Sequence, residues 1–205
     1  MDNLREYENN LMDEGYQLIG GVDEVGRGPL VGPVVAACCV LSRDFALDGL
    51  TDSKKLSEKK RNLYAAYIKE HAIAYGIGMV SPEEIDRINI YEASREAMKM
   101  AIAEVRSKIN LEYVLSDAMP IELDIPVLPI IKGDAKSISI AAASVIAKVT
   151  RDEMMYELDK CYPEYGFASH KGYPTKKHLE AIQKYGIFEG YRKSYGPVKE
   201  IIERK

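Results

Sequence analysis

Two adjacent carboxylates, Asp23 and Glu24, stand in the segment Gly-Val-Asp-Glu-Val-Gly-Arg-Gly at residues 21–28. The apolar run 16–22 predicts a strand before them, and residues 29–41 supply a second apolar segment after them. An acidic pair beside a buried strand is costly to desolvate unless a cation or several hydrogen-bond donors compensate it. The pair therefore indicates either a metal site or a structural ion pair with Arg27.

Two further predicted strands also end in an acidic residue. The apolar run 112–115 is followed by Asp117, and the run 127–131 is followed by Asp134. In open α/β sheets a ligand site commonly lies beyond the strand ends, where loops from separate strands meet. We therefore expect these two carboxylates to lie in one cleft with the first pair.

Four carboxylates in one cleft repel each other unless divalent cations lie between them. No Cys or His stands at ligand spacing, and an all-oxygen site favours Mg²⁺ or Mn²⁺. Such a site suits phosphoryl transfer, in which two ions ~3.5 to 4 Å apart activate water and stabilise the leaving oxygen. Adjacent strand residues point to opposite faces. Glu24 can thus join Asp23 only if the strand bends at Gly26, or if Glu24 reaches round or contributes its carbonyl.

Asp152 competes for the role of fourth ligand. In an unbroken helix from Ser137 it lies 15 residues further on, which is roughly 22 Å along the axis at ~1.5 Å per residue. We therefore assign Asp152 to structure, beside an Arg151 at the surface. Asp134 has an alternative as the cap of the same helix, because Asp is a favoured capping residue. Asp117 has no obvious partner among its neighbours.

The remaining pattern predicts a mixed sheet with helices on its faces. Residues 33–41 are nearly all apolar, as in a strand covered on both faces. Two glycines in the strand 72–80 indicate close approach by another element, and Ser57 and Ser81 are predicted helix caps. The expected strands are 16–22, 33–41, 72–80, 112–115 and 127–131, and the expected helices are 57–67, 81–109 with a break near Asn89, 137–160 and 175–185.

Length and composition predict one globular domain. The chain has 205 residues, 46% hydrophobic and 29% charged, which is enough to bury a full core. We expect a single domain over residues 1–205, with a core to about residue 165 and a basic helical extension from about 166. The run 28–41 contains two prolines and is shorter than the ~18 apolar residues of a membrane span. Residues 1–14 are polar and acidic, unlike a signal peptide, so we expect a cytoplasmic protein.

The cysteines predict neither a disulfide framework nor a zinc site. There are three, Cys38 and Cys39 in an apolar strand and Cys161 alone. An odd number without ligand spacing is typical of unpaired thiols. We interpret all three as core or half-buried residues.

Charge is distributed unevenly along the chain. The net charge is −4, but residues 170–205 contain nine Lys or Arg against four Glu, so this segment carries +5 and the rest −9. A basic end on an acidic body is typical of phosphate binding. A second cluster consists of Lys54, Lys55, Lys59, Lys60 and Arg61. Either cluster alone is also explained as a solvated surface.

Taken together, these motifs resemble the type 2 ribonucleases H, the ribonuclease HII family, along nearly the whole chain. The matching segments are 21–28, Pro-Leu-Val-Gly-Pro-Val-Val at 29–35, Asp-Ser-Lys-Lys-Leu-Ser at 52–57, Lys-Gly-Asp at 132–134, Ala-Ala-Ser-Val-Ile-Ala-Lys-Val-Thr-Arg-Asp at 142–152 and Gly-Tyr-Pro-Thr at 172–175. The resemblance implies an α/β protein of RNase H-like fold, with a mixed five-stranded sheet flanked by helices and a C-terminal helical extension.

The resemblance also implies roles for individual residues. The implied metal-binding catalytic set is Asp23, Glu24, Asp117 and Asp134. The residues implied to recognise the ribonucleotide are Gly26, Arg27, Gly28 and Tyr173, and those implied to hold phosphates are Ser53, Lys54 and Asn89, with Lys171, Lys176 and Lys177 extending the track. Glycines allow main-chain groups to approach a 2′-hydroxyl, the group by which proteins distinguish RNA from DNA.

The implied activity is an endoribonuclease that hydrolyses the RNA strand of RNA:DNA hybrids. It would cut on the 5′ side of ribonucleotides embedded in duplex DNA, with two metal ions, and leave 3′-hydroxyl and 5′-phosphate ends. Two alternatives stay open. One is another nuclease of the same fold, such as a junction resolvase, and the other is a hybrid-binding module without catalysis.

Two features concern the subtype and partners. Val25 stands where alanine is common in the family. Type 3 relatives carry an extra N-terminal nucleic-acid-binding domain, and only about twenty residues precede the first motif here, which favours type 2. Residues 198–205 lack the paired aromatics of a sliding-clamp peptide, so no clamp partner is implied. We expect a monomer that binds nucleic acid and no membrane.

Overall fold

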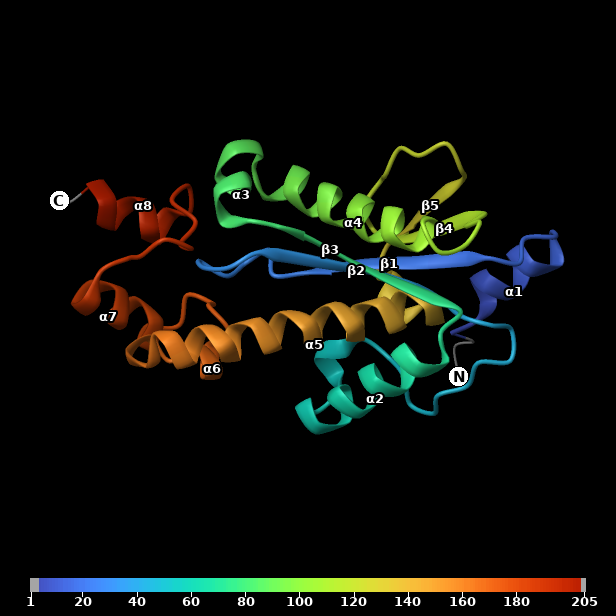
Figure 1. Cartoon of the computed structure of the whole chain (residues 1–205), viewed down its shortest axis with the longest axis horizontal. Helices are drawn as coiled ribbons and strands as arrows, with labels where there is room; N and C mark the ends of the chain where they lie inside the picture. The colour runs from blue at the N-terminus through green and yellow to red at the C-terminus, as the bar shows by residue number, and fades with distance from the viewer. Residues whose placement is uncertain (1–3, 204–205) are drawn as a thin grey trace.

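A mixed five-stranded sheet forms the centre of the computed structural model, which describes residues 4–203 (Figure 1). Residues 1–3 and 204–205, which the expected domain and basic segment include, lie outside the described residues. The strands follow the order β3-β2-β1-β4-β5, with β1 antiparallel to β2 and parallel to β4. Their bounds are β1 Ile19–Val25, β2 Val34–Val40, β3 Ala74–Val80, β4 Tyr113–Asp117 and β5 Val127–Ile130. The prediction of a mixed sheet of five strands is confirmed.

Strand β1 corrects one boundary that matters for the site. It begins at Ile19 and not at residue 16, and it continues through both carboxylates to Val25. Pairing with β2 sustains it there, because Glu24 lies opposite Ala36 and Val25 opposite Val35. Asp23 and Glu24 are therefore strand residues, and the expectation that the strand ends before them is wrong. Strand β2 is buried along its whole length, as predicted.

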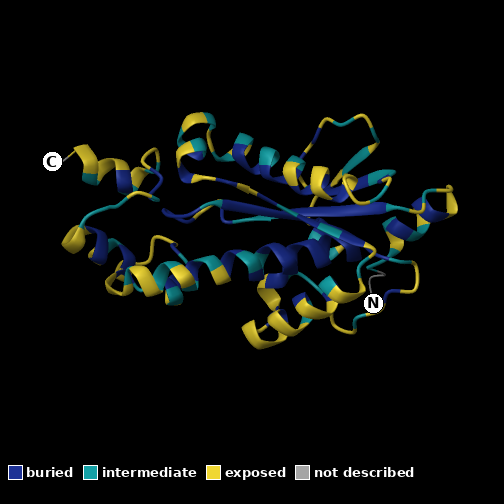
Figure 2. Cartoon of the chain, in the orientation of Figure 1, coloured by how far each residue is buried: buried dark blue, intermediate teal, exposed yellow. Residues whose placement is uncertain are grey.

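Helices cover both faces of the sheet. Helix α4 packs on β3 and β2, α5 packs on β1 and β2 from the opposite face, and α2 packs on the outside of α5 (Figure 1). The surfaces facing the sheet are buried and the outer surfaces exposed (Figure 2). The helices are α1 Glu6–Asp13, α2 Glu58–His71, α3 Pro82–Ile88, α4 Ile90–Arg106, α5 Ile138–Cys161, α6 Phe167–His170, α7 Lys176–Tyr185 and α8 Gly196–Glu203, with short 3₁₀ turns η1 Ser53–Lys55, η2 Gly133–Ala135 and η3 Pro163–Tyr165.

Side-chain caps fix where the helices begin. Ser57 and Ser81 cap α2 and α3 as predicted, each accepting a hydrogen bond of 3.3 Å from the backbone three residues on. Helix α2 runs four residues beyond its predicted end, to His71. The predicted break at Asn89 is confirmed, since its φ of 70° separates α3 from α4. Ser137 caps α5 through Ile140 N at 3.1 Å, so the alternative that Asp134 caps this helix is wrong.

Glycines let helices approach the sheet closely. A Cβ built on Gly78 of β3 would lie 2.0 Å from the Ala97 carbonyl oxygen of α4, which confirms the predicted close approach. On the other face, a Cβ on Gly21 of β1 would lie 2.1 Å from the carbonyl carbon of Ser139 in α5. Contacts this short exclude any side chain. The distance of α5 from the first carboxylate strand is thus set by Gly21.

The C-terminal helices pack against the loop that follows β1. Leu30 N donates to Gly172 O at 2.8 Å, Gly32 N donates to Gly190 O at 2.9 Å, and Arg192 N donates to Leu30 O at 2.8 Å. Beneath these bonds lies an apolar and aromatic cluster, which includes Tyr165, Phe167, Ile182 and Tyr191. The loop 26–33 is therefore hydrogen-bonded to the extension through residues 30 and 32, while Arg27 and Gly28 stay exposed.

Two burial expectations need correction. Cys38 and Cys39 are buried as predicted, but Cys161 is exposed because it ends α5 on the outer surface. Arg151, expected at the surface, has no exposed area, since its guanidinium donates to Pro33 O, Lys171 O and Val31 O. Among the described residues, no helix has the length and apolar character needed to cross a membrane.

Replacement of Gly21 by alanine tests the packing of α5 on β1. We expect Gly21→Ala to lower the free energy of unfolding by about 1 to 3 kcal/mol or more, because the new methyl group overlaps backbone atoms of α5. The control is Gly196→Ala, where a Cβ meets nothing within 4 Å. This control should change stability by less than about 1 kcal/mol. Urea unfolding of both variants measures the difference, and equal midpoints would contradict the packing argument.

A pH dependence of stability should arise at His178 in α7. Its Nδ1 lies 2.8 Å from Tyr173 O and so donates, while its Nε2 lies 2.9 Å from the Tyr191 hydroxyl and so accepts. Burial lowers the pKa of His178 to about 4, from 6.5. Between these pH values the unfolded chain binds more protons, so stability falls as pH is lowered from 6.5 towards 4. His178→Asn, which cannot titrate, should lose less thermal stability than the wild type over this range, and parallel melting curves would refute the assignment.

Candidate active site

The parallel register of β1 and β4 brings two carboxylates together. The pairing runs to Val22 opposite Ser116, so the next step along both strands sets Asp23 beside Asp117. Strand β5 then leads into η2, which carries Asp134. These three side chains each offer an oxygen, and the three oxygens lie within 4.8 Å of one another. Residues predicted from three separate strands therefore meet in one cluster.

Local hydrogen bonds hold the carboxylates in place. Gly133 N donates to Asp117 Oδ1 at 2.7 Å, and Glu24 N donates to Asp23 Oδ1 at 2.7 Å. The Ser144 hydroxyl of α5 also hydrogen-bonds to Asp23. A Cβ on Gly133 would lie 2.6 Å from the end of the Ile140 side chain and 3.3 Å from Asp117 Oδ1, so glycine lets η2 lie against Asp117 without displacing Ile140.

Glu24 stands apart from this cluster. Alternation along β1 directs it to the opposite face from Asp23, and β1 stays paired with β2 through Val25, so the strand does not turn at Glu24. Its Oε1 lies 3.5 Å from an Arg27 nitrogen, which confirms the ion pair considered from the sequence. Its Oε2 is buried and has no hydrogen-bond partner among the described residues. This orphaned oxygen leaves Glu24 able to bind a further ligand.

The electrostatics of the cluster fit a divalent cation. Burial raises the pKa of Asp23 well above its usual range, and the charges of Glu24 and Asp117 raise it further. Burial and the charge of Asp117 likewise raise the pKa of Asp134, and burial raises that of Glu24. Buried acids in mutual repulsion bind a hard cation favourably, because the ion replaces lost hydration and cancels the repulsion. The all-oxygen donor set and the unpaired Glu24 oxygen therefore suit Mg²⁺ or Mn²⁺.

A cavity of about 530 Å³ opens onto Asp117 and Asp134. Three lysines and three aspartates line it, and these charged residues are Asp52, Lys54, Lys55, Asp117, Lys132 and Asp134. Lysines in the same cavity as carboxylates that could hold a metal suit a phosphodiester, whose anionic oxygens need both. A second cavity of about 580 Å³, between α3 and residues 187–193, is lined by none of the four carboxylates predicted from the sequence.

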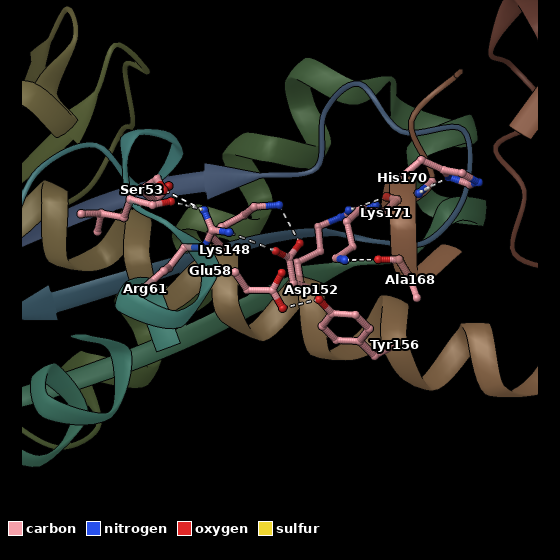
Figure 3. A network of polar contacts seen from close by, with 12 residues as sticks. Ser53, Glu58, Arg61, Lys148, Asp152, Tyr156, Ala168, His170 and Lys171 are labelled. Carbon is pink, nitrogen blue, oxygen red and sulfur yellow. Dashed lines mark hydrogen bonds and ion pairs between the residues drawn. The ribbon is translucent and has the colours of Figure 1, made fainter. Parts of the chain in front are cut away.

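Asp152 has structural partners, as assigned from the sequence. It accepts from Lys148 at 2.6 Å and lies 3.9 Å from Arg61, which in turn donates to Ser53 O at 2.7 Å (Figure 3). It does not belong to the carboxylate cluster. The Ser144 and Ser53 hydroxyls share a hydrogen bond of 2.8 Å, and Ser144 also contacts Asp23. This buried network therefore connects the base of the site to η1.

The residues expected to bind phosphate lie in different environments. Lys54 and Asn89 are exposed, whereas Ser53 is buried in the network described above. The Asn89 side-chain oxygen caps α4 by accepting from Tyr91 N and Glu92 N. On the extension, Lys176 and Lys177 are exposed, and Lys171 is half-buried with its ammonium 4.0 Å from the Tyr156 ring centroid.

Of the residues expected to read the sugar, Arg27, Gly28 and Tyr173 are exposed and Gly26 is buried. Gly26 has a φ of +97°, and Gly28 lies against Tyr173, since a Cβ on Gly28 would be 3.2 Å from the Tyr173 ring. Tyr173 is 39% exposed, so it is available to a ligand. Sequence reasoning missed two buried guanidiniums, Arg151 and Arg192, that hold this loop. Arg192 was counted among the basic residues of the extension, and no sequence signal distinguished it from them.

The fold and the cluster define a class of protein: a nuclease of RNase H-like fold with a carboxylate cluster that could hold a divalent metal ion. Residues 20–195 match a family model described as Ribonuclease HII, and the chain belongs to the ribonuclease HII family. Members of this family are metal-dependent endoribonucleases.

Curated relatives agree over nearly the whole chain. The chain is 55% identical over 201 residues to "Ribonuclease HII" of Bacillus mycoides strain KBAB4, covering 98% of this chain and 77% of the relative. It is 56% identical over 201 residues to "Ribonuclease HII" of Bacillus anthracis strain A0248, with the same coverage.

Solved structures confirm the predicted fold. The ribonuclease H2 of Pyrococcus horikoshii OT3 aligns with a TM-score of 0.75 at 27% identity, covering 91% of this chain and 98% of that one. RNase HII of Archaeoglobus fulgidus, from a complex with PCNA, aligns with a TM-score of 0.71 at 26% identity, covering 87% and 95%. Bst-RNase HIII in complex with Mn²⁺ shares the fold, with a TM-score of 0.67 at 18% identity over 93% and 70%.

Asp117→Asn should have opposite effects on stability with and without metal. In a chelator, the variant should melt at a higher temperature than the wild type, because one charge that repels Asp23 is removed. With Mn²⁺, the wild type should gain more stability than the variant, whose Mn²⁺ affinity we expect to fall at least about tenfold. The control is Asp124→Asn, an exposed carboxylate paired with Arg106. Thermal melting measures the stability of the wild type and the two variants, and calorimetric titration measures their Mn²⁺ affinity. Equal Mn²⁺ affinity of Asp117→Asn and the wild type would contradict the site.

Proposed function

We propose that this chain hydrolyses the RNA strand of RNA:DNA hybrids and cuts on the 5′ side of ribonucleotides embedded in duplex DNA. The products would carry 3′-hydroxyl and 5′-phosphate ends. The observation that carries the proposal is the cluster of Asp23, Asp117 and Asp134 within 4.8 Å, beside a cavity lined with lysines. Membership in the ribonuclease HII family supports the same substrate class.

The carboxylates are proposed to hold the metal. Asp23, Asp117 and Asp134 would be direct ligands, and Glu24 would contribute its unpaired oxygen. Two bound Mg²⁺ or Mn²⁺ ions would supply an activated water and stabilise charge on the departing 3′ oxygen. The hydrogen bonds from Gly133 N and Ser144 hold Asp117 and Asp23 in position before substrate arrives.

Selection of a ribose is proposed to occur at the loop 26–28. Gly26, Arg27 and Gly28 would present main-chain groups to the 2′-hydroxyl, because a loop with two glycines admits close backbone approach. Tyr173, half-exposed beside Gly28, would pack against the sugar at the junction. A deoxyribose would leave these polar groups unpaired, which is how a site rejects an analogue that lacks a hydroxyl.

The phosphate track is proposed to cross the cavity and the extension. Lys54 and Asn89 would contact phosphates near the cut, and Lys171, Lys176 and Lys177 would continue the track. The Asn89 amide nitrogen is free for this role while its oxygen caps α4. Ser53 would act indirectly, by positioning Lys54, because its hydroxyl is buried against Ser144.

We further propose a single domain that acts on nucleic acid as a monomer in the cytoplasm. Its core would end near residue 165, and residues 166–205 would form a substrate-binding extension, supported by the bonds from the extension to the loop 26–33. The PCNA complex belongs to the relative from Archaeoglobus fulgidus. For this chain we propose no clamp partner.

A duplex with one embedded ribonucleotide tests the proposed activity. With Mg²⁺ or Mn²⁺, we expect a single cut on the 5′ side of the ribonucleotide and no cut in the matching all-DNA duplex or in an all-DNA four-way junction. Denaturing gels of end-labelled strands measure the position. Cutting of all-DNA duplex at an equal rate would refute ribose selection, and cutting of the junction would favour a resolvase.

Asp117→Asn separates an enzyme from a binding module. Removing a carboxylate that would hold the ion should lower kcat by at least about a thousandfold, because the chemistry that the ion would supply, activation of water and stabilisation of the leaving oxygen, is weakened. Binding of the same duplex by fluorescence anisotropy should persist, since the lysines are unchanged. Wild-type protein that binds the duplex but never cuts it would refute catalysis.

A further inference from the structure

Arg192 is buried in an unusual way. It has no exposed area, and within residues 4–203 no carboxylate lies at ion-pair distance from it. Its five N–H groups are used instead on oxygens of neutral groups: Gly26 O at 2.7 Å, Arg27 O at 3.0 Å, Gly32 O at 2.8 and 3.0 Å and the Tyr195 hydroxyl at 3.0 Å. Burying a cation is costly, and here backbone carbonyls compensate it.

The two carbonyls at residues 26 and 27 belong to the loop proposed to read the sugar. Arg27 O receives a second hydrogen bond, from the Tyr195 hydroxyl at 2.6 Å. On the other side of the loop, the Arg151 side chain packs against Gly26, where a Cβ would lie 2.3 Å from Arg151 Nε. The loop therefore has both carbonyls bound from the extension and its first glycine braced by α5.

Because peptide bonds are planar, fixing the carbonyls of residues 26 and 27 also fixes the direction of the N–H groups that follow them. In a trans peptide the C=O and the following N–H point in opposite directions, and no peptide bond of the described chain is cis. Fixing Gly26 O and Arg27 O towards Arg192 therefore directs the N–H groups of Arg27 and Gly28 away from it. Neither N–H donates a hydrogen bond within residues 4–203. Two oriented, unused donors are thus held beside Tyr173.

We propose that Arg192 is a positioning residue for ribose selection, which sets the Arg27 and Gly28 amides against the 2′-hydroxyl through their carbonyl partners. This inference rests on the proposed function. Arg192 touches no substrate, and it makes the extension part of the sugar-reading site. Lysine cannot replace it, because one ammonium cannot reach the carbonyls of residues 26, 27 and 32 together.

The test uses full-length protein carrying Asp117→Asn, so that binding is measured without cutting. The readout is the ratio of the Kd for all-DNA duplex to the Kd for the same duplex with one ribonucleotide. Adding Arg192→Lys should lower this ratio about tenfold, the value of one well-placed hydrogen bond. In the otherwise wild-type chain, Arg192→Lys should keep its Mn²⁺ affinity, because the carboxylates lie on other elements.

The matched control is Ile182→Ala, a buried apolar residue of the extension that makes no side-chain hydrogen bond to the loop 26–28. It lowers stability by opening a cavity and should leave the ratio unchanged. An unchanged ratio in Arg192→Lys, or an equal fall in Ile182→Ala, would overturn the proposal. If Arg192→Lys does not fold, Tyr195→Phe decides, since it removes one donor to Arg27 O and should lower the ratio in the same direction; an unchanged ratio there also overturns it.

The outcome also separates this inference from the proposed function. If the Asp117→Asn protein binds both duplexes equally and the wild type cuts the all-DNA duplex at an equal rate, the proposed function fails. If the Asp117→Asn protein prefers the duplex with the ribonucleotide, and adding Arg192→Lys or Tyr195→Phe leaves that preference unchanged, only the role of Arg192 fails.

Discussion

Repulsion among one buried and two half-buried carboxylates is the constraint on which the rest of the structure depends. Asp23, Asp117 and Asp134 offer oxygens within 4.8 Å of one another, and burial raises the pKa of Asp23 and Asp134. Such a cluster is unfavourable without a cation, so the surrounding fold has to hold it. The parallel pairing of β1 with β4, the contact of Gly21 with α5 and the bond from Gly133 N to Asp117 provide that support.

Two of the four non-glycine residues with positive φ within residues 4–203 lie beside the same cluster. Ala118 and Lys132, which directly follow Asp117 and precede Gly133, adopt positive φ values of 53° and 57°. Non-glycine residues rarely adopt this conformation, and it persists where the surroundings determine it. Here Ala118 N donates to Ile130 O at 3.0 Å, and Ala135 N donates to Lys132 O at 3.1 Å. These two unfavourable backbone conformations therefore allow η2 to lie close to β4.

The extension contributes more than positive charge. Its basic composition predicted a phosphate-binding surface, and Lys176 and Lys177 are exposed as such a surface requires. Arg192 from the same segment is instead fully buried and bonded to carbonyls of the loop 26–33. A single compositional signal therefore covers two physical roles: exposed cations for a polyanion, and one buried cation that organises backbone dipoles.

The sequence by itself determined the five strands, the helix caps at Ser57 and Ser81, the break at Asn89 and the identity of the acidic residues, because these follow from local periodicity, capping chemistry and residue type. Tertiary structure alone decided that Glu24 lies outside the cluster of the other three carboxylates, that Arg151 is buried, and that Arg192 binds carbonyls of the loop after β1. The reason is physical: register between strands, side-chain burial and contacts across more than a hundred residues depend on how elements pack, and no local pattern encodes them.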